Sequence, residues 1–406
     1  MKPRPNSALR QRPKSAATTR AAVRSSKSFR PSSAAVSRQA RRKLFNEGTR
    51  SEVTATTIDL RLAAIDIAVR DNLDRLSFKP IIDQMNKAIE QKQPLKSLLI
   101  GESIGPRSCQ ALAECLHRTF YTSLKRISMW RAGIGNIGFL AFCATLPNLH
   151  QLSILELIDC ELTDPIQCCA ALSAALSTKN APKLKGLALD YNGLGRDGLR
   201  ALEMALRCAV SNGMQTLSLA FCDLDVECGS IIASFLTTIK SSLRELNLEG
   251  NQLGDQGLML LSAGIELNRS ISKLNLCANQ LGTPYVGLER FCQSLKQNLL
   301  LKHIDLDGNS FDEGSVDLIL DTIRSCPHIY EFQIPKTTAP ALYQTVQLAL
   351  RHNRAKCKRP EPTRPRSSRP ASEKSHELRR QRIIQDFLQS QRQRQMRAVS
   401  QGSAQK

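Results

Sequence analysis

Leucine and similar apolar residues recur at fixed places of an eleven-residue sequence pattern along the middle of the chain. This pattern is called the phrase below. The apolar residues occupy the first, fourth, sixth and eleventh places of the phrase, and asparagine holds the ninth, as in Leu184, Leu187, Leu189, Asn192 and Leu194. The phrase begins at nine positions: Leu95, Leu124, Leu152, Leu184, Met214, Leu243, Ile271, Leu301 and Ile329. Successive starts lie 28 to 32 residues apart, which chance does not produce over eight steps.

Each copy of the phrase predicts a short strand, a turn and a returning helix. The first leucines alternate as in a strand, and the segments between phrases carry apolar residues at three- and four-residue steps, as in a helix. We expect the asparagine side chain to bond the backbone of the turn that follows it. Cys160 and Cys222 take the asparagine place in two repeats, whereas Ala132 cannot form that bond, so we expect its turn to be weakened.

Repeats of this phrase and length resemble the leucine-rich repeats of the ribonuclease-inhibitor type, over roughly Leu95 to Pro335. The resemblance implies an α/β solenoid, a horseshoe with parallel strands on its concave face and helices on its convex face. Because one repeat cannot bury its own apolar face, the ends need caps. We expect an N-terminal helical cap over residues 54–94, repeats over 95–335 and a C-terminal capping helix over 336–352.

Charge divides the chain into a middle and two tails. Residues 1–50 hold 14 Lys and Arg against one acid, and residues 351–406 hold 16 against four, whereas the middle has a net charge of −4. Both tails are poor in large apolar residues, which predicts disorder. We therefore expect a disordered basic arm over residues 1–50 and a basic tail over 353–406, within which residues 375–396 have the pattern of a short helix that forms on binding.

Basic arms bind acidic surfaces through diffuse, salt-sensitive attraction. The candidates are tubulin, an anionic membrane and nucleic acid, and the last is disfavoured because neither arm interleaves aromatic with basic residues. The arms resemble those of microtubule-associated and ciliary proteins in composition, and the cap with its repeats is similar to centrosomal leucine-rich-repeat proteins. This resemblance implies a cytoplasmic, cytoskeletal location at the centrosome or cilium.

Two other interpretations of the tails stay open. The clusters Arg38 to Lys43 and Lys356 to Arg359 have the composition of nuclear import signals, and the first 46 residues lack acids, as organellar transit peptides do. Arg also stands three residues before each of three serines, a spacing that basophilic kinases require, and phosphorylation there would reduce the positive charge. These candidate phosphosites are Ser7, Ser15 and Ser33. A biased linker with accidental spacings accounts for them equally well.

Thirteen cysteines suggest a reducing compartment, because their number is odd, no Cys-x-x-Cys pair occurs and the N-terminus has no apolar secretory segment. Their spacing matches no metal-ligand set, and no phosphate-binding loop or catalytic constellation is visible. We therefore expect no metal, no cofactor, no enzymatic activity and no transmembrane segment.

The strand side chains that do not enter the core predict a partner-binding face. The candidate residues are Arg126, Trp130, Arg131, Glu156, Ile158, Asp190, Tyr191, Phe221, Glu245, Glu249, Asp305 and Asp307. Around Trp130 we expect an exposed apolar set suited to anchoring a partner. Acids dominate the later repeats and would attract a basic ligand, for which the chain's own tail is one candidate. A solvated face without a partner explains these acids too.

The sequence therefore favours a non-enzymatic scaffold whose concave face binds a protein while its basic tails anchor to an acidic surface. Two alternatives remain. The first is a regulator of a small GTPase or another enzyme, because the GTPase-activating protein for Ran and ribonuclease inhibitors are similar in repeat type. The second is a nuclear scaffold with import signals in its tails, or an innate-immune type scaffold, in either case with no cytoskeletal role.

Overall fold

The computed structural model describes residues 50–238, 240–282, 285–335 and 337–356. Contacts divide the chain into Met1–Ala55 and Thr56–Lys406, and all of the described strands belong to the second unit. The basic arm expected to be disordered over residues 1–50 lies outside the described residues apart from Arg50, and so do the candidate phosphosites Ser7, Ser15 and Ser33 and the short helix expected at 375–396.

The described strands form one parallel sheet in which the strands follow one another in chain order. Each begins two residues after a start of the repeated phrase, so the predicted register is confirmed for all nine copies. The strands are β1 (Ser97–Ile100), β2 (Arg126–Trp130), β3 (Ile154–Ile158), β4 (Gly186–Ala188), β5 (Thr216–Ser218), β6 (Glu245–Asn247), β7 (Lys273–Asn275), β8 (His303–Asp305) and β9 (Glu331–Gln333).

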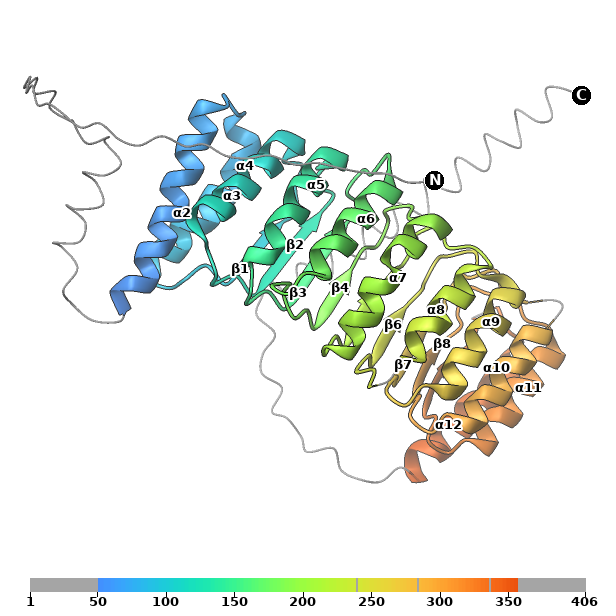
Figure 1. The fold of residues 1–406 in the computed structure, drawn as a ribbon. Helices are drawn as coiled ribbons and strands as arrows, with labels where there is room; N and C mark the ends of the chain where they lie inside the picture. The colour runs from blue at the N-terminus through green and yellow to red at the C-terminus, as the bar shows by residue number, and fades with distance from the viewer. Residues whose placement is uncertain (1–49, 239, 283–284, 336, 357–406) are drawn as a thin grey trace, which may run out of the picture. The chain divides into compact units, whose positions relative to one another are not determined.

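The returning segments form helices that cover one face of this sheet, as Figure 1 shows. They are α4 (Gly105–Thr119), α5 (Gly135–Thr145), α6 (Pro165–Leu176), α7 (Gly195–Ser211), α8 (Cys228–Leu236), α9 (Gly254–Leu267), α10 (Val286–Gln297) and α11 (Glu313–Ser325), with a 3-10 turn, η1 (Leu146–Asn148), after α5. Strands on one layer and helices on the other give the α/β solenoid predicted from the repeats. None of the described helices combines the length and apolar character needed to cross a membrane.

The core lies between the two layers. The second residue of each strand points into it, and these residues form a continuous buried row from Leu98 on β1 to Phe332 on β9. Side chains before and after that residue point the other way because strand side chains alternate. The sheet face away from the helices is therefore left for polar residues.

Where the ninth place of the phrase is asparagine, its side chain bridges two repeats, which the sequence did not predict. Asn251 Nδ2 donates to the carbonyl oxygens of Leu248 in its own repeat (2.8 Å) and Leu219 in the preceding one (2.9 Å), and its Oδ1 accepts from Cys222 N (3.0 Å). Cys222 replaces this donor in its own repeat, since its thiol donates to Leu189 O (3.2 Å). The side chain therefore connects backbone groups in neighbouring turns.

Helices close both ends of the described repeats. Before β1, α2 (Arg50–Arg70) and α3 (Arg75–Glu90) lie in the region expected for the N-terminal cap, and Leu60 and Ile81 from them are fully buried. After β9, α12 (Pro340–Lys356) runs four residues past the expected end. Buried Asn353 donates to Ile323 O at 2.9 Å, which ties that additional turn to the last repeat.

Candidate functional site: the open face of the sheet

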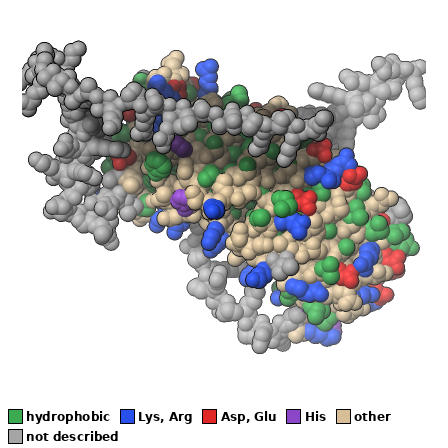
Figure 2. Space-filling model, viewed as in Figure 1, with side chains coloured by type: hydrophobic (Ala, Val, Ile, Leu, Met, Phe, Trp, Pro, Cys, Tyr) green, Lys and Arg blue, Asp and Glu red, His purple; other side chains and the backbone are tan. Residues whose placement is uncertain are grey.

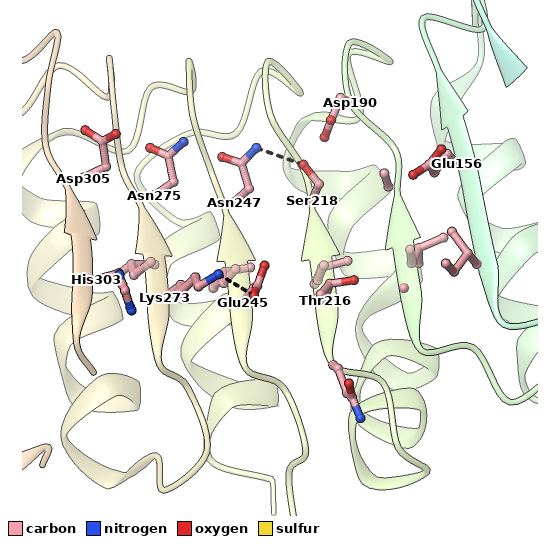
Figure 3. Close-up of a pocket in the computed structure, with 18 of the residues that line it drawn as sticks. Glu156, Asp190, Thr216, Ser218, Glu245, Asn247, Lys273, Asn275, His303 and Asp305 are labelled. Atoms are coloured by element: carbon pink, nitrogen blue, oxygen red, sulfur yellow. Dashed lines mark hydrogen bonds and ion pairs between the residues drawn. The ribbon is translucent and has the colours of Figure 1, made fainter. Parts of the chain in front are cut away.

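A groove of about 800 Å³ runs along the helix-free face from β2 to β9 (Figure 3). Two rows of side chains that the strand register aligns run along this face, and all of their members except Arg126 and Ser128 line the groove. The first row, at the first residue of each strand, is Arg126, Ile154, Gly186, Thr216, Glu245, Lys273, His303 and Glu331. The second row, two residues later, is Ser128, Glu156, Ala188, Ser218, Asn247, Asn275, Asp305 and Gln333.

Side-chain hydrogen bonds to the backbone fix the second row at the ends of the later strands. Asn247 Oδ1 accepts from Glu249 N (3.1 Å), and Asp305 Oδ1 accepts from Asp307 N (2.9 Å). Asn247 Nδ2 also donates to Ser218 Oγ at 3.0 Å, which links two strands across the floor of the groove. Local bonds of this kind hold short polar side chains in place. The second row is therefore a series of preoriented polar groups.

Basic side chains contact two of the acids in the later repeats. Lys273 Nζ lies 2.8 Å from Glu245 Oε1, and His303 Nδ1 contacts Glu331. The Nε2 atom of His303 lies 3.2 Å from the Tyr330 hydroxyl, so both ring nitrogens have partners. The first row therefore places basic side chains beside its acids, which the sequence-based count of acids did not capture.

In the early repeats, Glu156 is held at both carboxylate oxygens. Arg126 Nη2 donates to Oε1 at 2.8 Å, and Ser128 Oγ donates to Oε2 at 2.6 Å. Ser128 is itself buried, with 1% of its surface exposed. This end of the groove is consequently rigid, and a ligand there would meet the flanks of a preformed ion pair.

The expectation of an exposed apolar set around Trp130 is wrong. Trp130, Ile158 and Phe221 are 8%, 5% and 9% exposed, and Tyr191 is half-buried. The reason is tight packing along the turns, because a Cβ atom at Gly250 would lie only 2.2 Å from the Phe221 ring. That these residues bind a partner stays a prediction, and a partner could contact only the exposed edges of their side chains.

The eighth residue of the phrase, which follows the strand, has a left-handed backbone in seven successive repeats. These residues are Arg131, Asp159, Tyr191, Phe221, Gly250, Ala278 and Gly308, with φ between 51° and 70°. The glycines at this position, Gly250 and Gly308, indicate the left-handed conformation from the sequence alone, since only glycine adopts it without steric cost. The turns thereby form a stacked rim along the ends of the strands.

The first two side chains of this rim form an ion pair. Arg131 Nε lies 3.3 Å from Asp159 Oδ2, with the arginine exposed and the aspartate partly covered. Burial raises the pKa of the Asp159 carboxyl, and the Arg131 charge opposes that shift.

The remaining predicted residues also lie at the strand ends. Asn275 Nδ2 donates to Glu249 Oε2 (3.2 Å), Asp190 Oδ1 accepts from Ala220 N (2.9 Å), and Asp307 Oδ1 accepts from Gly308 N (2.9 Å).

The described thiols are mostly buried, where a reduced thiol packs as a small apolar group. Burial raises the pKa of Cys109 and of Cys115 to about 12, which keeps both thiols protonated near neutral pH. Over the described ranges, no three His, Cys, Asp or Glu side chains come together in a way that could hold a metal ion. What the open face offers chemically is hydrogen bonding and charge.

These features define the class of the protein. One parallel sheet in chain order, one helix per repeat and an asparagine bridge between turns make it a leucine-rich-repeat solenoid of the ribonuclease-inhibitor type.

Comparisons with known proteins agree with this class. The chain is 29% identical over 226 residues to mouse "NACHT, LRR and PYD domains-containing protein 14", 34% identical over 189 residues to bovine "NACHT, LRR and PYD domains-containing protein 3" and 27% identical over 221 residues to pig "Ribonuclease inhibitor". The matched segments span 55%, 45% and 54% of this chain, but only 22%, 17% and 46% of the relatives. No protein-family model matches the chain.

Proposed function

We propose that this chain is a non-enzymatic scaffold that binds a protein partner in the groove on the open face of the sheet. The observation that carries the proposal is the second row, in which strand register and local hydrogen bonds place polar groups side by side across several repeats. Successive strands lie about 4.8 Å apart, so five such positions extend over roughly 19 Å. A surface of this length suits a protein segment better than a small molecule.

The test is a change of the groove floor in the full chain. Ser218→Arg with Asn275→Arg places two long cationic side chains across the second row, where both native side chains are partly buried. Proteins co-purified from cells would be quantified for this variant and for a matched control, Gln256→Arg with Ser230→Arg, at exposed positions of α9 and α8. Selective loss of co-purified proteins from the groove variant supports the proposal. Equal profiles for both variants contradict it.

A second part of the proposal concerns the tails. Their charges, +13 for residues 1–50 and +12 for residues 351–406, favour attachment to an acidic surface such as microtubules at the centrosome or cilium. Tagged full-length protein would be imaged in ciliated cells beside a chain that begins at Thr54 and ends at His352. Centriolar, ciliary or microtubule signal that becomes diffuse on truncation supports attachment. Nuclear signal would instead favour import sequences.

An enzyme inhibitor is the alternative that one comparison favours, since pig ribonuclease inhibitor is among the relatives. Under this alternative the same groove would hold an enzyme and exclude its substrate. Titration of the full chain into a pancreatic-type ribonuclease assay, and into GTP hydrolysis assays of small GTPases, would reveal it as a stoichiometric change in rate. Unchanged rates leave the scaffold as the preferred function.

A further inference from the structure

A line of basic residues lies on the rim where helices end and strands begin. The residue immediately before each strand defines what we call the strand-start row: Lys96, Lys125, Ser153, Lys185, Gln215, Arg244, Ser272, Lys302 and Tyr330. Backbone hydrogen bonds join neighbouring members along the row, for example from Lys125 N to Lys96 O and from Lys302 N to Ser272 O. Five of these nine residues are cationic and none is acidic, so the row concentrates one sign of charge.

The cations of the strand-start row lack the partners that other sheet cations have. Arg126 and Lys273, one residue later in their repeats, pair with Glu156 and Glu245. By contrast, all five cations of the row are exposed, and none forms a side-chain ion pair or hydrogen bond with another described residue. Their charge is therefore available to an external anion.

Basic residues in the same connections add to this charge. Exposed cations between a helix end and the strand-start row are Lys92, Lys179, Lys183, Lys240 and Arg269. In Figure 2, Lys and Arg side chains line the lower margin of the repeats, the margin at which β1 begins in Figure 1.

Helix stabilisation does not account for the row. Cations favour a helix C-terminus only within its last turn. Lys96 lies six residues beyond the end of α3, and Lys185 lies nine residues beyond the end of α6.

Large apolar side chains are exposed on the same rim. Phe120, Leu267, Leu299 and Leu300 are 68%, 63%, 67% and 40% exposed. The pair before β8 is held outward, because Asn298 Oδ1 accepts from the backbone N–H groups of Leu300 (2.9 Å) and Leu301 (3.0 Å), which directs Leu301 into the core. The apolar tips and the cations are thus fixed features of one edge.

The opposite rim has a different composition. It also exposes apolar side chains, Ile137 and Ile166 among them, but its connections carry the acids Glu102, Asp159, Glu161, Asp223, Asp225, Glu227 and Asp307. Among the described residues, acids therefore accompany the apolar tips of the opposite rim, whereas the connections of the strand-start rim carry cations and no acid.

We propose that the strand-start rim binds an anionic lipid surface. Its cations would lie against phosphate and carboxylate groups of the lipid headgroups, while Phe120, Leu299 and Leu300 enter the boundary between headgroups and acyl chains. With strands about 4.8 Å apart, the nine positions extend over roughly 38 Å, enough to contact many headgroups. Two members of the row, Lys185 and Gln215, also line the sheet-face groove, so the two surfaces adjoin there, and the other members of the row lie outside the groove lining.

A nucleic acid fits this rim less well. Stacking of bases needs several aromatic side chains interleaved with cations. The strand-start row has one aromatic residue, Tyr330, whose hydroxyl lies 3.2 Å from His303 Nε2. An acidic protein segment would use the cations but leave the exposed leucines without a role.

The first test compares two triple variants of the full chain for binding to phosphatidylcholine vesicles that contain phosphatidylserine. The rim variant is Lys185→Glu, Arg244→Glu and Lys302→Glu. The control, Arg107→Glu, Arg200→Glu and Arg207→Glu, changes exposed cations of α4 and α7 and has the same net charge. We expect the rim variant to bind at least about tenfold more weakly than the control, since each basic residue near an anionic surface contributes measurably. Equal affinities would overturn the proposal.

The second test reports insertion, which basic tails alone would not produce. Leu299→Trp and the control Ile166→Trp each add a second tryptophan fluorophore to the chain, whose native Trp130 is buried. We expect a blue shift and quenching by brominated lipid only for Leu299→Trp. Absence of both changes refutes the rim contact, and so does a rim variant that loses affinity for duplex DNA or polyglutamate while its vesicle binding is unchanged.

Discussion

The ring of Tyr191 stacks on the ring of Phe221, with centroids 4.6 Å apart and planes 8° from parallel. Both residues have a left-handed backbone, with φ of 62° and 54°. The ring of Phe221 in turn covers Gly250, the residue at the same place in the next repeat. The turns of three successive repeats therefore pack together. The two rings stack on each other, and the Phe221 ring fills the space that a side chain at position 250 would occupy.

The first prediction concerns this contact. Gly250→Ala should destabilise the fold by about 2–4 kcal/mol, because the new Cβ must displace the buried Phe221 ring and the backbone there is left-handed. Thermal and denaturant unfolding of the full chain would measure the change. Gly254→Ala is the matched control, since its φ is +58° and its new Cβ meets only Val226 Cγ2 at 3.9 Å. Equal losses for the two variants would show that the ring yields freely.

The second prediction concerns the asparagine bridge. Asn251→Ala removes three donated and two accepted hydrogen bonds to backbone groups, so we expect a loss of about 3 kcal/mol or more. Chemical denaturation would measure it. Asn247→Ala, on the open face of the sheet, provides the control and should cost well under half as much. A small effect at Asn251 would mean that water replaces the bridge.

The third prediction concerns pH. Burial lowers the pKa of His328 below its ordinary value of 6.5. The unfolded chain therefore binds a proton more readily than the folded chain, so stability falls as pH decreases through 6.5 toward the folded pKa. We expect the melting temperature to fall between about pH 7.5 and about pH 5.5, and to fall less for His328→Gln. Parallel pH profiles for the two proteins would contradict this role.

The fourth prediction concerns thiol reactivity. Cys208 is exposed, whereas burial raises the pKa of Cys169 to about 12 and that of Cys292 to about 11. Thiolate is the reactive form, so in a Cys357→Ser background we expect one fast-reacting thiol in the native chain near neutral pH. A thiol reagent followed by peptide mapping would locate it, and Cys208→Ser should remove the fast phase. Rapid labelling of Cys169 would indicate opening of the helical layer.

The sequence determined the repeats without help from the structure. All nine strand positions followed from the phrase. The leucine at a fixed place must point into the core, and a register shifted by one residue would turn it to the open face in all nine repeats. The two rows of the groove followed with them. Cys222 could also be placed correctly, since it stands where asparagine stands elsewhere.

Only the tertiary structure decided which outward positions are open. Trp130 and Phe221 occupy outward places in the phrase, yet side chains of adjacent turns bury them. The pairing of Lys273 with Glu245 and the bridge from Asn251 into the preceding repeat depend on distances across strands, which a linear pattern does not contain. Burial within one repeat follows from its own periodicity, whereas exposure, pairing and the unpaired cations of the strand-start row depend on what the neighbouring repeats place beside each residue.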